Sequence, residues 1–341
     1  SVVEASSLEP LTATITVLDT PHEAVAQRHT FHLPAGSYTV RAWRSGSRVV
    51  TSTATVVAGG ASDMELALPA APSLLLVDSG GWYYQSEIDY FRRALDDLSY
   101  AYNEWPIRQL SKDIPAVSDL TPYDIVVWSA PRDAPGYIGA SDVITGYLET
   151  GGRMLLSGQD VGFWDGGGSG ISWSPYYRNY LKTQLVEDNA PTRTLDGVEG
   201  DIFAGTTITI TGAGGAGNQD YPDVVSVVDT DAAAPALGYR DDGCGGVRVG
   251  TCLDYRVLYL SFGFEGINDR EARRAVMGQA VDWLSAPPPA VGLEIEPQAH
   301  LEIGSPGGIV THTWRVRHIG QGGGDDEVGL TLEGATWPTE L

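Results

Sequence analysis

The sequence predicts a multidomain protein in which an α/β domain with a doubly wound parallel sheet is flanked by two small all-β sandwich modules. Three observations support this. At 341 residues the chain is longer than one small core requires. Apolar runs alternate with amphipathic helical segments between residues 73 and 286. On either side, short alternating runs separated by turn residues replace this pattern. We therefore expect domains at 1–70, 73–286 and 290–341.

The N-terminal segment predicts a small antiparallel sandwich. Strand-like alternation with frequent turn residues covers residues 12–19, 29–36, 37–46, 47–60 and 64–69. The prolines of residues 69–73 continue neither a sheet nor a helix, so this run predicts a linker.

Residues 73–286 predict the doubly wound domain. Continuous apolar runs typical of strands buried on both faces lie at 73–81, 123–131, 153–160 and 257–265. Helical stripes lie at 86–105, 141–152 and 268–285, the first opened by a Ser86–Asp89 capping box and the last by an Asn268–Glu271 box. This alternation implies a flavodoxin-like parallel sheet with helices on both faces. We expect residues 161–255 to form a loop-rich insertion at one end of the sheet.

The C-terminal segment returns to strand-like runs, at 291–297, 300–306, 309–320 and 327–334. These runs present an apolar face that comprises Trp314, Val316, Val328, Leu330 and Leu332. Four strands are too few to bury that face against a second sheet. We therefore expect strands beyond residue 341, a neighbouring subunit or the α/β domain to cover it.

Charge and cysteine content restrict the setting and the partners. A formal net charge of −23 repels nucleic acid and anionic lipid, so neither is an expected partner. No apolar run is long enough to insert into a membrane. Seven residues separate Cys244 from Cys252, a spacing that predicts a disulfide across a β-hairpin and hence an oxidising compartment. Nothing indicates a cofactor.

Histidine placement argues against hydrolase chemistry in the α/β domain. All six histidines lie outside residues 70–290, at His22, His29, His32, His300, His312 and His318. A serine or cysteine nucleophile needs a base, and the domain has no imidazole to serve as one. The sequence therefore predicts that this chain is not an enzyme.

The run VLYLSFGFE at 257–265 resembles the strand on which class I glutamine amidotransferases carry Phe-His-Pro-Glu. Gly263 stands where the catalytic histidine would be, and Glu265 is retained. The family's Gly-x-Cys-x-Gly elbow would follow the strand at 153–160, where this chain has Ser157-Gly158-Gln159-Asp160. The resemblance implies a degenerate amidotransferase-like domain in which neither the catalytic cysteine nor the catalytic histidine remains.

Polar and aromatic residues beyond the strand ends indicate a possible ligand edge. Asp78, Gln159, Asp160 and Glu265 each follow a buried strand, and ligands of such sheets bind beyond the carboxyl ends. Trp82, Trp164 and Trp173 belong to aromatic clusters expected at the same edge. These residues would bind a cation, a sugar or a peptide. The alternative is structural, with loop amides satisfying the carboxylates and the rings packing the insertion. Metal binding stays undecided.

Two further resemblances imply an extracellular accessory role. LPAGSYTVRAW resembles carboxypeptidase-regulatory-like and transthyretin-like modules, and the stretch from residue 311 onward resembles the first half of an Ig-like domain. The whole arrangement resembles the non-catalytic C-terminal regions of large secreted bacterial subtilisin-like peptidases, through LSGQDVG, VEGD, GNQDYPD and FGFEGIND. These likenesses imply a structural or accessory segment of a secreted or cell-surface bacterial protein, whose partners are other domains of its parent chain or neighbouring subunits.

Three other functions remain open. The aromatic edge would suit a carbohydrate- or peptide-binding module. An incomplete C-terminal sandwich would suit a subunit of an extracellular polymer that a neighbouring subunit completes by strand sharing. A hydrolase would need two carboxylates about 5–10 Å apart in an open cleft. The state of the carboxyl edge, open or plugged by residues 161–180, separates the binding and hydrolase alternatives from a structural role.

Overall fold

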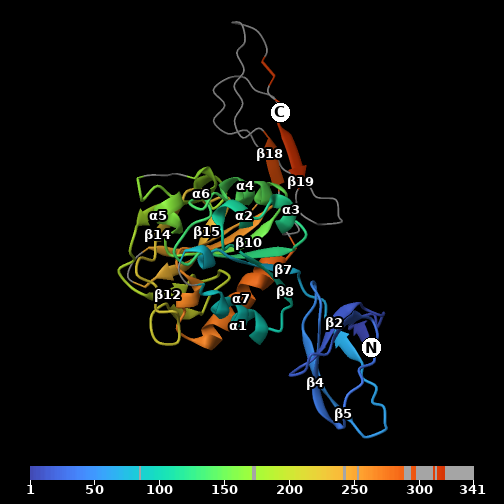
Figure 1. Ribbon diagram of the computed structural model, residues 1–341. Coiled ribbons are helices and arrows are strands. Elements are labelled where there is room, and N and C mark those ends of the chain that lie inside the picture. The colour runs from blue at the N-terminus through green and yellow to red at the C-terminus, as the bar shows by residue number, and fades with distance from the viewer. Residues whose placement is uncertain are drawn as a thin grey trace. The chain divides into compact units, whose positions relative to one another are not determined.

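The structure is a computed structural model that describes residues 1–83, 86–170, 174–240, 243–251, 253–287, 293–296, 310–311 and 313–318 (Figure 1). The chain divides into two compact units, Ser1–Ala286 and Pro287–Leu341. The segments expected as separate domains, 1–70 and 73–286, both lie in the first unit.

The first unit begins with two small sheets. Their strands are β1 (Val2–Glu4), β2 (Ala13–Val17), β3 (Glu23–Ala26), β4 (Gly36–Trp43), β5 (Val50–Val56) and β6 (Leu66–Leu68). Antiparallel pairing gives the order β3-β2-β4-β5, and β1 pairs with β6 in parallel. Both sheets contribute to one core, in which Val2 and Leu68 pack with Ile15 and Ala42.

The prediction of a strand at 29–36 is wrong, because the chain already turns back after β2. Asp19 adopts a φ of +59°, and the Thr20 hydroxyl donates to the Val17 carbonyl at 2.7 Å. This tight turn brings Glu23–Ala26 directly alongside β2, and the segment from residue 27 to 35 contains no strand.

The N-terminal sheets contact the rest of the unit through Arg48. Its guanidinium carbon lies 3.6 Å from the centroid of the Tyr100 ring, and it donates to the Leu98 carbonyl. The Val49 amide donates to the Ser99 carbonyl at 2.7 Å. A cation–π contact and backbone hydrogen bonds therefore join the two parts.

The predicted parallel sheet is confirmed. Its strands are β7 (Leu74–Asp78), β8 (Tyr102–Pro106), β9 (Ile125–Ser129), β10 (Arg153–Ser157) and β17 (Arg256–Leu260). They pair in the order β8-β7-β9-β10-β17, all in parallel. Numbered along the chain this order is 2-1-3-4-5, the doubly wound arrangement found in flavodoxin.

Helices cover both faces of this sheet (Figure 1). Helices α1 (Ile88–Asp97) and α7 (Arg270–Ser285) pack Phe91 and Met277 against Leu76 and Val127 on one face. On the other face α3 (Val117–Leu120), α4 (Ser141–Glu149) and α6 (Pro175–Asn179) pack against Trp128 and Leu156. Shorter elements are η1 (Gly80–Trp82), α2 (Leu110–Asp113), α5 (Val161–Asp165) and η2 (Phe264–Gly266).

The insertion between β10 and β17 extends the sheet itself. Its strands are β11 (Thr183–Glu187), β12 (Thr194–Gly197), β13 (Thr207–Thr209), β14 (Val224–Val227), β15 (Ala233–Tyr239) and β16 (Cys244–Val249). Strand β16 pairs antiparallel with β17, and the sheet continues from β16 in the order β15-β12-β13. Strand β14 pairs with both β16 and β11. We expected only loops and hairpins at one end of the sheet, but the insertion adds strands to it. Without the insertion β17 would be an edge strand with unpaired backbone groups, and β16 pairs with these groups.

Two helix starts and one helix end differ from the predictions. Glu87, not Ser86, occupies the N-cap position of α1; the Ser86 hydroxyl donates to the Asp78 carboxylate at 2.7 Å and accepts from the Ile88 amide at 3.3 Å. The cap of α7 is Asp269, whose side chain accepts from the Ala272 amide at 2.8 Å. Helix α1 ends at Asp97 and not near residue 105, since Ser99 takes a φ of +56° and the chain turns into β8.

The predicted disulfide is not found among the described residues. Cys244 is a buried free thiol whose Sγ lies 3.1 Å from the Gly246 carbonyl, and Cys252 lies outside the described residues. Strand β16 runs from Cys244 to Val249. These residues thus form a strand and not the turn of the hairpin that the spacing suggested.

The second unit contains an antiparallel pair, β18 (Leu293–Glu296) and β19 (Arg315–His318). Both strands fall within predicted runs. The runs at 300–306 and 327–334, with Val328, Leu330 and Leu332, lie outside the described residues. Trp314 is 45% exposed and Val316 is partly buried. Within the part of the chain that the structure describes, no helix is long and apolar enough to cross a membrane.

Candidate functional site

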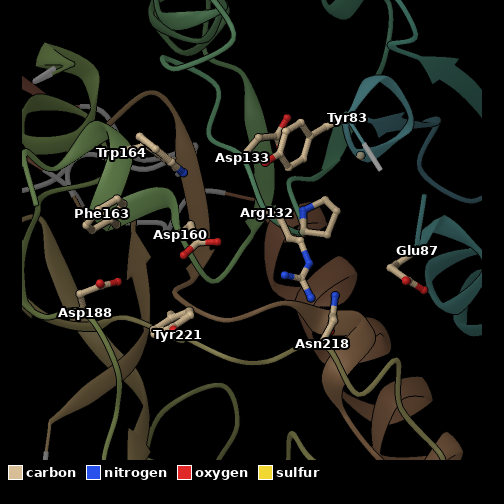
Figure 2. A pocket seen from close by; sticks show the side chains of 12 residues that line it. Tyr83, Glu87, Arg132, Asp133, Asp160, Phe163, Trp164, Asp188, Asn218 and Tyr221 are labelled. Atoms are coloured by element: carbon tan, nitrogen blue, oxygen red, sulfur yellow. The ribbon is translucent and has the colours of Figure 1, made fainter. Parts of the chain in front are cut away.

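A cleft opens where the connections of the parallel sheet diverge. The chain leaves β7 toward α1 on one face and leaves β9 toward α4 on the other, so their carboxyl ends form the switch point at which such sheets bind ligands. A cavity of about 670 Å³ lies there (Figure 2). It is lined by Gly80, Tyr83, Glu87, Pro131, Arg132, Asp133, Asp160, Phe163, Trp164, Asp188, Asn218 and Tyr221. The carboxyl edge is therefore open at this point.

Aromatic rings from three segments of the chain form a continuous row beside the cleft. The centroids of Tyr83 and Trp82 are 5.1 Å apart, and those of Trp82 and Tyr137 are 6.4 Å apart. Tyr137 and Trp164 follow at 4.4 Å, and Trp164 and Phe163 at 5.0 Å. We call these five residues the aromatic row. Contacts of this kind hold rings in fixed positions and give the cleft a rigid apolar wall.

Asp133 holds one end of the row in place. This carboxylate is buried and accepts from the Ser79 hydroxyl at 2.9 Å and from the indole Nε1 of Trp82 at 2.9 Å. Burial raises the pKa of Asp133 to about 7, although both hydrogen bonds act in the opposite direction. Its oxygens are already engaged within the protein, so its role is to position Trp82.

Asp160 and Asp188 are carboxylates without such support. Neither side chain accepts a hydrogen bond or forms an ion pair with any described residue, and Oδ1 of Asp188 is buried without a partner. Burial, reinforced by the nearby charge of Asp188, raises the pKa of Asp160 to about 7. Burial also raises the pKa of Asp188. Both groups are thus poised to accept donors from a ligand.

The charge balance of the cleft is negative. Glu87, Asp133, Asp160 and Asp188 line it against a single cation, Arg132. Burial raises the pKa of Glu87 despite the opposing charge of Arg132. Arg132 itself forms an ion pair with Asp220 at 3.1 Å. Its charge is therefore shared with a residue outside the cleft lining.

A second polar cluster lies at the ends of β10 and β17, where the degenerate catalytic positions were expected. We call it the closed cluster; it comprises Ser157, Gly263, Glu265, Asn218 and Gln219. The buried Ser157 hydroxyl donates to the Phe262 carbonyl at 2.9 Å and accepts from the Phe264 amide at 2.7 Å. Both contacts link two strand ends, so Ser157 serves the fold.

The space for a histidine at position 263 is filled. A Cβ on Gly263 would lie 2.0 Å from Glu265 Oε1 and 2.4 Å from Gln219 Nε2. Glu265 Oε1 accepts from Asn218 Nδ2 at 2.8 Å and from Gln219 Nε2 at 3.2 Å. Complete burial raises the pKa of Glu265 to about 7. At the elbow, a Cβ on Gly158 would lie 2.1 Å from the Ala130 carbonyl oxygen, so no nucleophile side chain fits there.

The predicted ligand-edge residues divide between cleft and interior. Asp160 and Trp164 line the cleft, and Trp82 belongs to the aromatic row. Asp78 instead accepts from Ser86 and from the Gly80 amide at 3.2 Å. The Gln159 amide donates to the carbonyls of Pro131 and Asn218 and accepts from the Tyr221 amide. Glu265 is buried in the closed cluster, and Trp173 lies outside the described residues.

The predictions missed several cleft residues. Arg132 and Asp133 directly follow the apolar run at 123–131, so the rule that selected Asp160 would have selected them as well. Asp188 and Tyr221 flank strands of the insertion, and no sequence signal places them at this edge. No group of three or more His, Cys, Asp or Glu side chains that could hold a metal ion occurs among the described residues.

Comparisons with known proteins add little. No protein-family model matches the sequence. No curated protein matches it. Among solved structures, a ThuA-like protein from Bacteroides uniformis is similar over 62% of this chain and 89% of its own, with 12% sequence identity and a TM-score of 0.40. At that TM-score the likeness supports no inference about the site.

Proposed function

We propose that this chain is a non-catalytic accessory segment of a large secreted or cell-surface bacterial protein, and that its cleft binds carbohydrate. The observation that carries the binding role is the aromatic row beside carboxylates that lack donors, at the switch point of the sheet. Sugars pack the C–H faces of their rings on aromatic side chains and donate hydroxyl hydrogen bonds to carboxylates. The cleft offers both kinds of contact together.

Two features favour binding over catalysis. Residues 70–290 contain no histidine, and the Ser157 hydroxyl is engaged with two strand ends. Hydrolysis by paired carboxylates needs one group to deliver a proton and the other to act as base or nucleophile. Asp133 is already engaged with Ser79 and Trp82, which leaves the carboxylate pair Asp160 and Asp188 on one side of the cleft (Figure 2).

The flanking segments belong to the same proposal. The two N-terminal sheets and their shared core suit a sandwich of the carboxypeptidase-regulatory or transthyretin-like kind. The β18–β19 pair suits the start of an Ig-like module. In an extracellular parent chain, modules of this type would present the α/β domain to its ligand and contact other domains. The free thiol of Cys244 gives this setting no support.

Binding of soluble oligosaccharides to the full chain, measured by calorimetry, tests the proposal. We expect Trp164→Ala to weaken binding about tenfold or more, because it removes the tryptophan of the aromatic row that lines the cleft. Trp314→Ala is the matched control, since Trp314 is an exposed tryptophan in the second unit.

Two results would overturn the proposal. If no soluble glycan binds, or if Trp164→Ala binds as tightly as the unmodified chain, the cleft is not a carbohydrate site. If the chain cleaves a glycan and Asp160→Asn abolishes cleavage, the non-catalytic assignment is wrong and the carboxylate-based hydrolase takes its place.

A further inference from the structure

We propose that the ligand of the cleft is a sugar that carries a protonated amine, and that Asp160 and Asp188 bind its ammonium group. This inference rests on the carbohydrate-binding function proposed above and specifies the class of sugar. It is drawn from the two carboxylates without donors, the charge of the cleft and the aromatic surface next to them.

The first argument is the difference between partnered and unpartnered carboxylates. Asp133 accepts hydrogen bonds from Ser79 and Trp82, as buried carboxylates in proteins normally do. Asp160 and Asp188 have no donor among the described residues, although both are partly buried and near enough for their charges to interact. Two such carboxylates are stabilised most by a group that brings both positive charge and several N–H donors.

The second argument is the sign of the charge. Of the charged residues that line the cleft only Arg132 is cationic, and it is paired with Asp220. An anionic sugar, such as a uronic acid or a sulfated sugar, would meet like charge from Asp160, Asp188 and Glu87. A neutral sugar would donate hydrogen bonds but would bring no positive charge to favour the ionised form of these carboxylates. A cationic sugar satisfies both requirements.

The third argument is the position of the aromatic rings. Figure 2 shows Asp160 between Trp164 and Asp188, with Phe163 on the same side of the cleft and Glu87 across it. A sugar ring that packs on Trp164 therefore brings a ring substituent toward Asp160. An ammonium at that position also gains attraction from the indole face. A metal ion fits less well, since no group of three or more ligands exists among the described residues.

Protonation gives a second, independent readout. The charged groups around Asp160 are Asp188, Arg132, Asp133, Asp220 and Asp223. With a pKa of about 7, Asp160 is mostly protonated in the free protein at a slightly lower pH. An ammonium beside it favours the carboxylate form and lowers that pKa, so binding at about pH 6 releases up to about one proton. A neutral sugar lowers the pKa only through its hydroxyl hydrogen bonds and releases fewer protons.

The experiment compares a glucosamine trisaccharide with its N-acetylated form and with maltotriose, by calorimetry on the full chain at about pH 6 in buffers of different ionisation enthalpy. We expect the amine form to bind about tenfold tighter or more than the N-acetylated form, with the larger proton release for the amine form. Asp160→Asn and Asp188→Asn should each remove most of this preference, whereas Asp231→Asn, an exposed control on the turn before β15, should keep it.

The outcomes separate this inference from the proposed function. If all three sugars bind with equal affinity, or if the N-acetylated form binds best, the ammonium inference is overturned and carbohydrate binding stands. If no sugar binds, both fail. A preference for the amine form that survives both substitutions also overturns the inference, because the ammonium must then be held elsewhere. Binding of trilysine without binding of any sugar refutes the carbohydrate assignment.

Discussion

The closed cluster and the cleft lie at the same carboxyl edge of one sheet, yet only the cleft leaves space beside its polar groups. In the closed cluster the Ser157 hydroxyl and Oε1 of Glu265 meet protein donors or acceptors, although Glu265 Oε2 is buried without a partner, and side chains fill the space beside Gly263. In the cleft, Asp160 and Asp188 border a cavity and accept no hydrogen bond from a described residue. The difference shows that polar residues at a sheet edge do not by themselves make a site; an open cavity beside them is also needed.

The insertion produces this difference. Asn218 and Gln219, which fill the closed cluster, come from the segment that precedes β14. The same segment contributes Tyr221 to the cleft rim without filling the cleft.

The largest expected effect comes from adding a methyl group in the closed region. Gly158→Ala would place its Cβ 2.1 Å from the Ala130 carbonyl oxygen and 2.9 Å from Val161 Cγ2. The carbonyl belongs to the backbone and cannot rotate away, so we expect a loss of about 3 kcal/mol in the free energy of unfolding, or failure to fold. Urea denaturation measures the loss.

Gly81→Ala is the matched control from the cleft side. Its Cβ would meet Arg108 Nη1 at 3.3 Å and Asp78 Oδ2 at 3.5 Å, which are near-ordinary contacts. We expect a change below about 1 kcal/mol. Equal losses for Gly158→Ala and Gly81→Ala would contradict the claim that the turn after β10 is more tightly packed than the turn after β7.

A smaller effect is expected from the titration of Glu265. Its pKa is raised from 4.5 to about 7 in the folded protein, so the stability that its neutral form contributes is present below about pH 4.5 and is lost as the pH rises through about 7. Glu265→Gln removes this titration. The free energy of unfolding of the variant minus that of the unmodified chain should therefore rise by about 2 kcal/mol from about pH 5 to about pH 8.

Chemical denaturation of both proteins across this pH range measures the difference. Asp133 and Asp160 titrate in the same window, but they are present in both proteins and cancel in the comparison. A constant difference between the two proteins at every pH would show that Glu265 does not change protonation in the folded state.

The sheet could be predicted from the sequence because burial on both faces leaves a clear mark. Strands β7, β9, β10 and β17 are continuous apolar runs, and the structure buries nearly every residue in them. Strand β8 was missed because it is an edge strand with a partly exposed alternation. Its aromatic residues extended the stripe of α1, and nothing local revealed that the helix ends at Asp97.

The site could be predicted only where strand and ligand residues are adjacent in sequence. Asp160 and Trp164 follow β10 directly, so the strand-end rule located them. Asp188 reaches the cleft through the pairing of β11 with β14, which joins segments about forty residues apart and leaves no periodic pattern. The spacing of Cys244 and Cys252 did not reveal β16 for a related reason, because the pairing of this strand with β15 and β17 is not visible in a local pattern.

The smallest expected effect compares two carboxylates of the cleft that differ in their partners. Asp160→Asn removes a partly buried charge that has no donor and that is repelled by Asp188. At about pH 8, where Asp160 is ionised, we expect the variant to be more stable by up to about 1 kcal/mol. Asp133→Asn should be less favourable than Asp160→Asn, because the charge-assisted hydrogen bonds that the carboxylate accepts from Ser79 and Trp82 become weaker neutral ones. Thermal melts of the two variants beside the Asp231→Asn control measure both changes. A destabilised Asp160→Asn would mean that this carboxylate has a structural role and that the protein itself satisfies it.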